Sequence, residues 1–118
     1  MRATTQHFLD LMAMEIEDMK KDIEALRRHG AERGERHEIS DYVLKENDAV
    51  YRHVETGIKC LQHTMAQINH ADHADVSALV VALRTLCHDR ANELGLHEGM
   101  IRTLHRKMDK VAAFLGKK

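Results

Sequence analysis

The sequence predicts an all-α protein: an elongated, antiparallel up-down-up bundle of three long helices, forming a single domain over residues 1–118. Three observations lead to this prediction. Apolar residues recur at alternating spacings of three and four along three long stretches, the coiled-coil-like pattern of helices that pack side by side. The chain has no proline, and charged residues make up 31% of it, as expected for long helices with solvated outer faces. The connections between the stretches are short and polar, which places sequential helices antiparallel.

The first helix is predicted from about Thr5 to His29. Gly30 is its expected C-terminal cap, because glycine adopts the left-handed conformation that often ends helices. Residues 31–34 then form a short loop. The apolar seam of this helix comprises Leu9, Met12, Ile16, Met19, Ile23 and Leu26.

The second helix is predicted from about residue 35 to residue 69. Its seam comprises Leu44, Asn47, Tyr51, Val54, Ile58, Leu61, Met65 and Ile68. Asn47 is the one polar residue in it, and a lone asparagine in a seam often fixes register or oligomeric state. Val43 and Val50 widen the apolar stripe, so that this helix is expected to face two neighbours rather than one.

The third helix is predicted over residues 74–115, with Gly95 and Gly99 marking a potential break that would give four helices. A continuous helix is favoured, because no Ser, Thr, Asp or Asn directly after Gly95 could cap a new helix, and because the seam keeps its phase across the glycines. That seam is apolar at both ends and polar near its centre. It comprises Val80, Leu83, Cys87, Arg90, Leu94, His97, Ile101, Leu104, Met108, Val111 and Leu115.

A first helix of this length is too short to cover the far end of the hairpin that the second and third helices form. The uncovered part would include Leu79, Val80, Val81 and Leu83, an apolar group that is unfavourable in water. The sequence therefore predicts a homodimer or higher oligomer in which a second copy covers this end.

The composition argues against several classes of partner. The formal net charge is -1, with acids and bases intermixed, so no basic stripe for nucleic acid and no polybasic membrane patch is present. No stretch resembles a signal peptide or a membrane span, and two cysteines are too few for a disulfide framework. A cytoplasmic protein is expected. The compositional outlier is histidine, with ten residues dispersed along the chain, which could confer a response to pH or to a metal.

A first candidate metal site groups Cys60, His63, Cys87 and His88. Cys60 and His63 are three residues apart on one helix face, and antiparallel pairing brings Cys87 within about one turn of Cys60. Thiolate and imidazole ligands suit zinc. The alternative interpretation is a small buried thiol near a half-exposed imidazole, with no metal.

A second candidate site, for zinc or iron, groups Glu93 and His97 with Glu46 and His53 of the facing helix. Carboxylates and imidazoles from facing helices build the metal sites of helical bundles. However, no Glu-x-x-His pair of the di-iron type occurs. The alternative is a buried polar layer in which His97, Asn47 and Arg90 exchange hydrogen bonds with nearby acids.

Signatures of enzymes are missing from the sequence, which has neither a nucleophile elbow nor a glycine-rich phosphate loop. The expected function is therefore a small oligomeric scaffold or interaction protein without catalytic activity and without a required cofactor. The alternative is a zinc- or iron-binding bundle that acts as a sensor or carrier.

Overall fold

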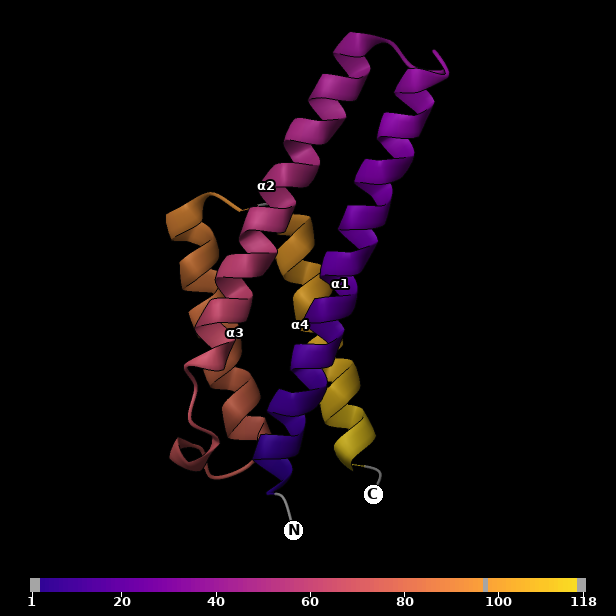
Figure 1. Cartoon of the computed structure of the whole chain (residues 1–118). Coiled ribbons are helices and arrows are strands. Elements are labelled where there is room, and N and C mark those ends of the chain that lie inside the picture. Colours follow the sequence, from indigo (N-terminus) through magenta and orange to yellow (C-terminus); the bar gives the residue numbers. More distant parts are fainter. Residues whose placement is uncertain (1–2, 97, 117–118) are drawn as a thin grey trace.

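The computed structural model describes residues 3–96 and 98–116, and this part of the chain is entirely α-helical apart from its connections (Figure 1). The molecule is elongated, with extents of 54 × 30 × 19 Å. The predicted all-α class is confirmed, but the described chain has four long helices rather than three. They are α1 (Thr4–Glu35), α2 (Asp41–Ala66), α3 (Val76–Leu94) and α4 (Glu98–Gly116), with a short 3₁₀ turn, η1 (His70–Asp72), between α2 and α3.

Helix α1 does not end at Gly30, as the sequence predicted, but continues through Gly34 to Glu35. Its end is made by His37, which adopts the left-handed conformation with φ 58°. The amide of His37 donates to the carbonyl of Gly34, and the amide of Glu38 donates to that of Arg33, which is the Schellman arrangement. The predicted loop over residues 31–34 is therefore helix, because a histidine takes the conformation that glycine was expected to supply.

Side chains cap the starts of α2 and α3. The Ser40 hydroxyl accepts a hydrogen bond from the amide of Val43, 3.2 Å away, and α2 starts at Asp41, about six residues later than predicted. The Asp75 carboxylate accepts from the amide of Ala78 at 2.8 Å and starts α3. Each cap satisfies an amide that has no partner within its own helix.

The predicted continuous third helix is wrong, because the chain reverses at Gly95 and α4 runs back along α3. Gly95 is left-handed, with φ 65°, and the amide of Leu96 donates to the carbonyl of Ala91 at 2.9 Å. Leu96 and Met100 then pack against Gly57 of α2, where a Cβ atom would lie 2.8 Å from each of them. The missing side chain at Gly57 thus makes room for the turn, and this tertiary contact is not visible in the local sequence.

All four long helices contribute to one core. Its most deeply buried side chains are Phe8, Met12, Ile16, Ile58, Leu61, Leu79, Leu83, Cys87, Leu104 and Met108. Most of these are predicted seam residues, so their burial confirms the predicted three-and-four spacing of the helix faces.

The apolar end expected to bind a second copy is largely covered within one chain, so that prediction is wrong in its premise. Leu79 and Leu83 are fully buried, because α1 and the returning α4 both pack against α3. Val80 is half-buried, and Val81 is 66% exposed. A continuous third helix would have left this surface open, whereas the reversal at Gly95 closes it.

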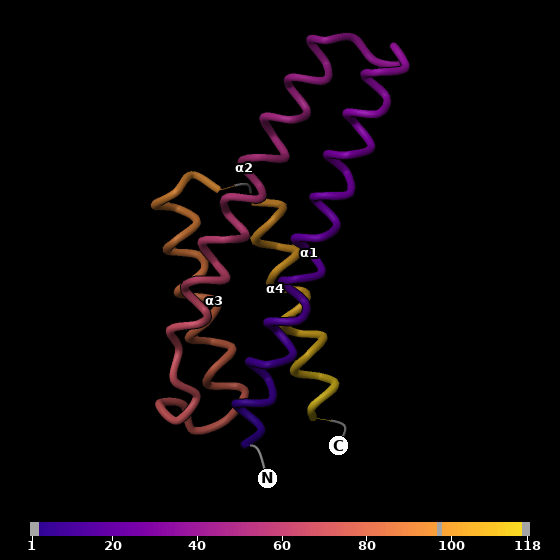
Figure 2. The backbone as a smooth tube through the Cα atoms, viewed as in Figure 1, coloured from indigo at the N-terminus to yellow at the C-terminus, as the bar shows by residue number. Residues whose placement is uncertain are grey.

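Helices α1 and α2 are much longer than α3 and α4, with 32 and 26 residues against 19 each. They therefore project past the four-helix body as a two-helix hairpin (Figure 2). The start of α1 and the end of α4 lie at the opposite end of the molecule from the hairpin tip (Figure 1).

Candidate functional site

The first candidate metal site is not assembled in the structure. Cys87 is fully buried in the core, and burial raises the pKa of its thiol to about 11, which disfavours the thiolate that binds metal. Cys60 is half-buried. His63 and His88 are exposed and engage neighbours on their own helices, accepting from the side-chain amides of Gln67 at 3.1 Å and Asn92 at 3.3 Å respectively. Within residues 3–96 and 98–116, no three His, Cys, Asp or Glu side chains gather closely enough to hold a metal ion.

The second candidate site is also dispersed. Glu46 lies exposed on the projecting hairpin, and Glu93 forms an exposed ion pair with Arg90 at 3.2 Å. His53 Nε2 donates to the carbonyl oxygen of Gly95 at 3.1 Å and so supports the reversal between α3 and α4. His97 lies outside the described residues.

The alternative of a buried polar layer is wrong for both of its members that the structure describes. Arg90 and Asn47 are exposed, although each falls on a predicted seam. The seams run beyond the part of the bundle where other helices cover them: α3 ends four residues after Arg90, and Asn47 lies on the projecting part of α2.

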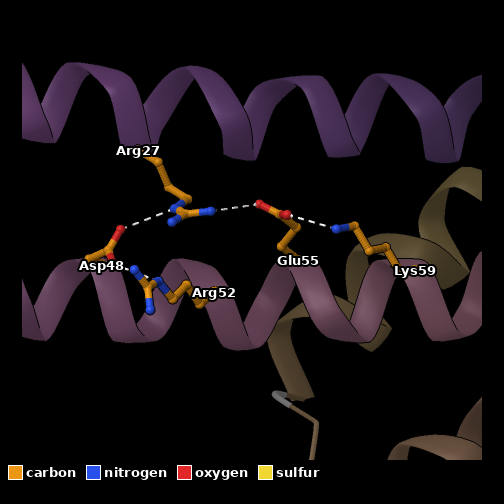
Figure 3. Close-up of polar contacts among 5 residues, drawn as sticks. All are labelled: Arg27, Asp48, Arg52, Glu55 and Lys59. Carbon is orange, nitrogen blue, oxygen red and sulfur yellow. Dashed lines mark hydrogen bonds and ion pairs between the residues drawn. The ribbon is translucent and has the colours of Figure 1, made fainter.

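One side of the projecting hairpin is held by a row of ion pairs (Figure 3). Arg27 of α1 bridges two carboxylates of α2, donating from Nε to Asp48 at 3.0 Å and from Nη1 to Glu55 at 3.1 Å. Arg52 and Lys59 join the same carboxylates at 2.8 and 3.1 Å. Hydrogen bonds from Lys59 and Arg27 lower the pKa of Glu55, so this carboxylate stays ionised. The contacts of Arg27 fix the two helices against each other along the hairpin.

The other side of the hairpin is apolar, and we call it the hairpin face. It consists of Ile23 and Leu26 of α1 with Val43, Val50 and Val54 of α2. Leu26, Val43 and Val50 are 47%, 41% and 46% exposed, whereas Ile23 and Val54 pack partly against the core. The sequence predicts a second neighbour of α2 at Val43 and Val50, yet no described helix of the chain covers them.

The hairpin face meets the body at a groove of about 420 Å³. Ile23, Val50 and Val54 form its hairpin side, and Gly99 and Met100, at the start of α4, form its body side. The hairpin face is therefore continuous with the core. Helix α4 covers α1 and α2 on the body side of the groove and leaves them uncovered on the hairpin side.

A second apolar groove, of about 530 Å³, lies between α1 and α4 at the other end of the molecule. Met14 and Phe114 are exposed beside it. Ion pairs from Glu15 to Lys107 and Lys110, at 3.0 and 2.8 Å, cross its edge and tie the two helices together. This groove therefore has polar contacts across it, unlike the hairpin face.

Sequence analysis missed a polar cluster between α3 and α4. Arg84 pairs with Asp109, and His105 lies half-buried beside them. Burial lowers the pKa of His105, and the charges of Arg84 and His88 lower it further, while Asp109 acts in the opposite direction. Arg84 Nε and His105 Nε2 are buried and make no hydrogen bond to any described residue.

No protein-family model, no curated protein and no solved structure matches this chain. Among the described helices, none is long and apolar enough to cross a membrane.

Proposed function

We propose that this chain is a small, oligomeric, non-catalytic interaction protein, a helical-bundle scaffold that binds protein through the hairpin face. The single observation that carries the proposal is the exposure of Leu26, Val43 and Val50 on the part of α1 and α2 that α4 does not cover. The other apolar groove, between α1 and α4, is instead crossed at its edge by the ion pairs of Glu15. An apolar face that continues a core into solvent is typical of a protein-binding surface.

The energetics favour an occupied hairpin face. Burying a Val or Leu side chain completely contributes roughly 1.5–3 kcal/mol. These three side chains are about half exposed, so about half of that free energy is still to be gained. Covering them would add about 1 kcal/mol each before the cost of association is subtracted. A partner with a matching apolar helix surface would gain a similar amount on its own side.

The two sides of the hairpin suit such a role. The ion pairs around Arg27 hold α1 and α2 in a fixed relation, so the face is formed before a partner arrives. A surface organised in advance loses less conformational entropy on binding. The pKa shifts of Glu55 and Cys87 follow from ion pairing and from core burial respectively, and neither group lies in the groove beside the face.

The experiment is site-specific photo-crosslinking in the cells from which the protein comes. A benzophenone side chain replaces Val50 in one variant and Val81, which is 66% exposed on α3, in the control. We expect protein adducts from position 50 and few from position 81. Equal labelling at the two positions, or no adduct at position 50, would overturn the proposal.

A further inference from the structure

We infer that the contact between α3 and α4 is acid-sensitive: the two helices stay packed together while His105 is neutral, and their edge opens when its imidazole gains a proton. This edge consists of Arg84 and His88 of α3 with His105 and Asp109 of α4, and we call these four residues the α3–α4 edge cluster. Opening would expose Cys87, the fully buried neighbour of His88 on α3. The device lies away from the hairpin face and does not depend on the proposed function.

The four side chains meet because α3 and α4 run antiparallel from the turn at Gly95 (Figure 1). Arg84 pairs with Asp109 across the two helices. On α3, His88 lies four residues closer to the turn than Arg84. On α4, His105 lies four residues closer to the turn than Asp109. Since four residues span about 6 Å of helix, the two imidazoles lie at the same height, about one turn from the ion pair.

His105 is poorly placed to carry a charge. Its Nε2 atom is buried and makes no hydrogen bond to any residue that the structure describes. A neutral imidazole carries a proton on one ring nitrogen only, whereas an imidazolium carries one on both. Protonation therefore adds a charged donor to a ring that has a buried nitrogen without an acceptor among the described residues, which is unfavourable.

The charges that face His105 add to this cost. Among the described residues they are Arg84 and His88 of α3 and Asp109 of its own helix, and only Asp109 favours the imidazolium. That carboxylate is already paired with Arg84. In acid, when imidazoles become cations, the cluster holds an excess of positive charge around one carboxylate.

The other helices beside α4 do not offset this excess. Glu15 of α1 reaches α4, but its two carboxylate oxygens accept from Lys107 and Lys110. Lys107 follows His105 by two residues, roughly 200° around the helix, so these ion pairs lie on the side of α4 away from α3. Helix α2 meets the start of α4 at Gly57, which carries no charge.

Protonation and opening therefore favour each other. Burial lowers the pKa of His105 below its ordinary value of 6.5, and the charges of Arg84 and His88 lower it further. An imidazole that has moved into water regains its ordinary affinity for a proton. The closed edge is thus stable above about pH 6.5 and loses stability as the pH falls through the lowered pKa of the closed state.

The test measures the reaction of Cys87 with a dithiodipyridine reagent, which modifies thiols in weak acid as well as at neutral pH. The full chain carries Cys60→Ser, so that Cys87 is its only thiol. Each rate is divided by that of a small free thiol at the same pH, which removes the intrinsic effect of pH on the reagent. We expect the normalised rate to rise roughly fivefold or more between pH 7.5 and pH 5.

Three histidine variants identify the group responsible. His105→Gln, which keeps a polar side chain but does not titrate, should reduce the rise to within about twofold. His88→Gln changes an exposed residue that folding does not require, and it should reduce the rise in part. His63→Gln, the matched change at an exposed histidine of α2, should leave the rise as in the parent chain. Circular dichroism at both pH values shows whether each variant remains folded.

Urea separates a local opening from unfolding of the whole chain. A local opening exposes little surface, so the rate at pH 5 should be nearly constant over low urea concentrations. A rate that climbs steeply from the first addition of urea would overturn the inference, because Cys87 would then be exposed by global unfolding. A normalised rate that does not change between pH 7.5 and pH 5 would also overturn it, as would an undiminished rise in both His105→Gln and His88→Gln.

Discussion

Truncation of Leu83 to alanine tests the closure of the core by α4. Leu83 is fully buried on α3, and Leu83→Ala removes three carbon atoms, worth about 0.8 kcal/mol each in transfer free energy. With the cavity that remains, we expect the free energy of unfolding to fall by roughly 3–4 kcal/mol. For a chain of this size that loss corresponds to a decrease of about 10–15 °C in Tm.

The matched control is Val81→Ala, two residues along the same helix, where the side chain is 66% exposed. This change should alter the free energy of unfolding by less than about 0.5 kcal/mol. The assay is urea unfolding followed by circular dichroism at 222 nm, at two protein concentrations tenfold apart. Equal effects of the two substitutions would refute the buried position of Leu83. A cost of Leu83→Ala that grows with protein concentration would refute its burial within one chain.

Four further outcomes are expected. Gly95→Ala should lower the free energy of unfolding by about 1–2 kcal/mol in the same urea assay, because residue 95 is left-handed with φ 65°. Gly99→Ala is the control: a Cβ atom there meets open space, so this change should be neutral or stabilising. A thiol-exchange reagent should titrate Cys60 but not Cys87 in the native protein and both in denaturant, because Cys87 is fully buried with a pKa of about 11. Folding lowers the pKa of His105 below 6.5, so the neutral imidazole stabilises the folded state above pH 6.5, and this stabilisation is lost as the pH falls through the lowered pKa of the folded state. His105→Gln should therefore flatten the dependence of Tm on pH between 7 and 5. Protein purified without a histidine tag should contain no stoichiometric zinc or iron by plasma mass spectrometry, and addition of either metal should leave Tm unchanged.

The helical pattern made much of the fold predictable. Apolar spacing placed Leu61, Leu83, Leu104 and Met108 on core faces, and all four are buried to 1% exposure or less. This works because burial of one helix face dominates the energy of a bundle, and the period of 3.6 residues records that face directly in the sequence.

The helix ends were less predictable, because glycines of similar local context behave differently. Gly30 is an ordinary helical residue, while Gly95 is left-handed and reverses the chain. What separates them is a distant contact, since Leu96 fits against the bare backbone of Gly57 only when the chain turns. His37 ended α1 in the left-handed conformation, which glycine adopts more readily than histidine.

The candidate site was predictable only in part. The widened stripe at Val43 and Val50 predicts a second neighbour of α2, but both side chains are exposed and no described helix covers them, so this part stays a prediction. The location of the uncovered surface was wrong, because the reversal at Gly95 covers Leu79 and exposes the outer hairpin instead. An error at one helix end thus moved the predicted interface from one end of the molecule to the other.

Small-angle X-ray scattering of the purified chain over a range of concentrations tests most directly whether this is an oligomeric protein that uses the hairpin face. We expect the scattering mass to rise above that of one 13.6 kDa chain as the concentration increases, and to fall back towards it in Val50→Lys. A mass that stays at one chain would contradict self-association, and a rise that Val50→Lys leaves unchanged would contradict the role of the hairpin face.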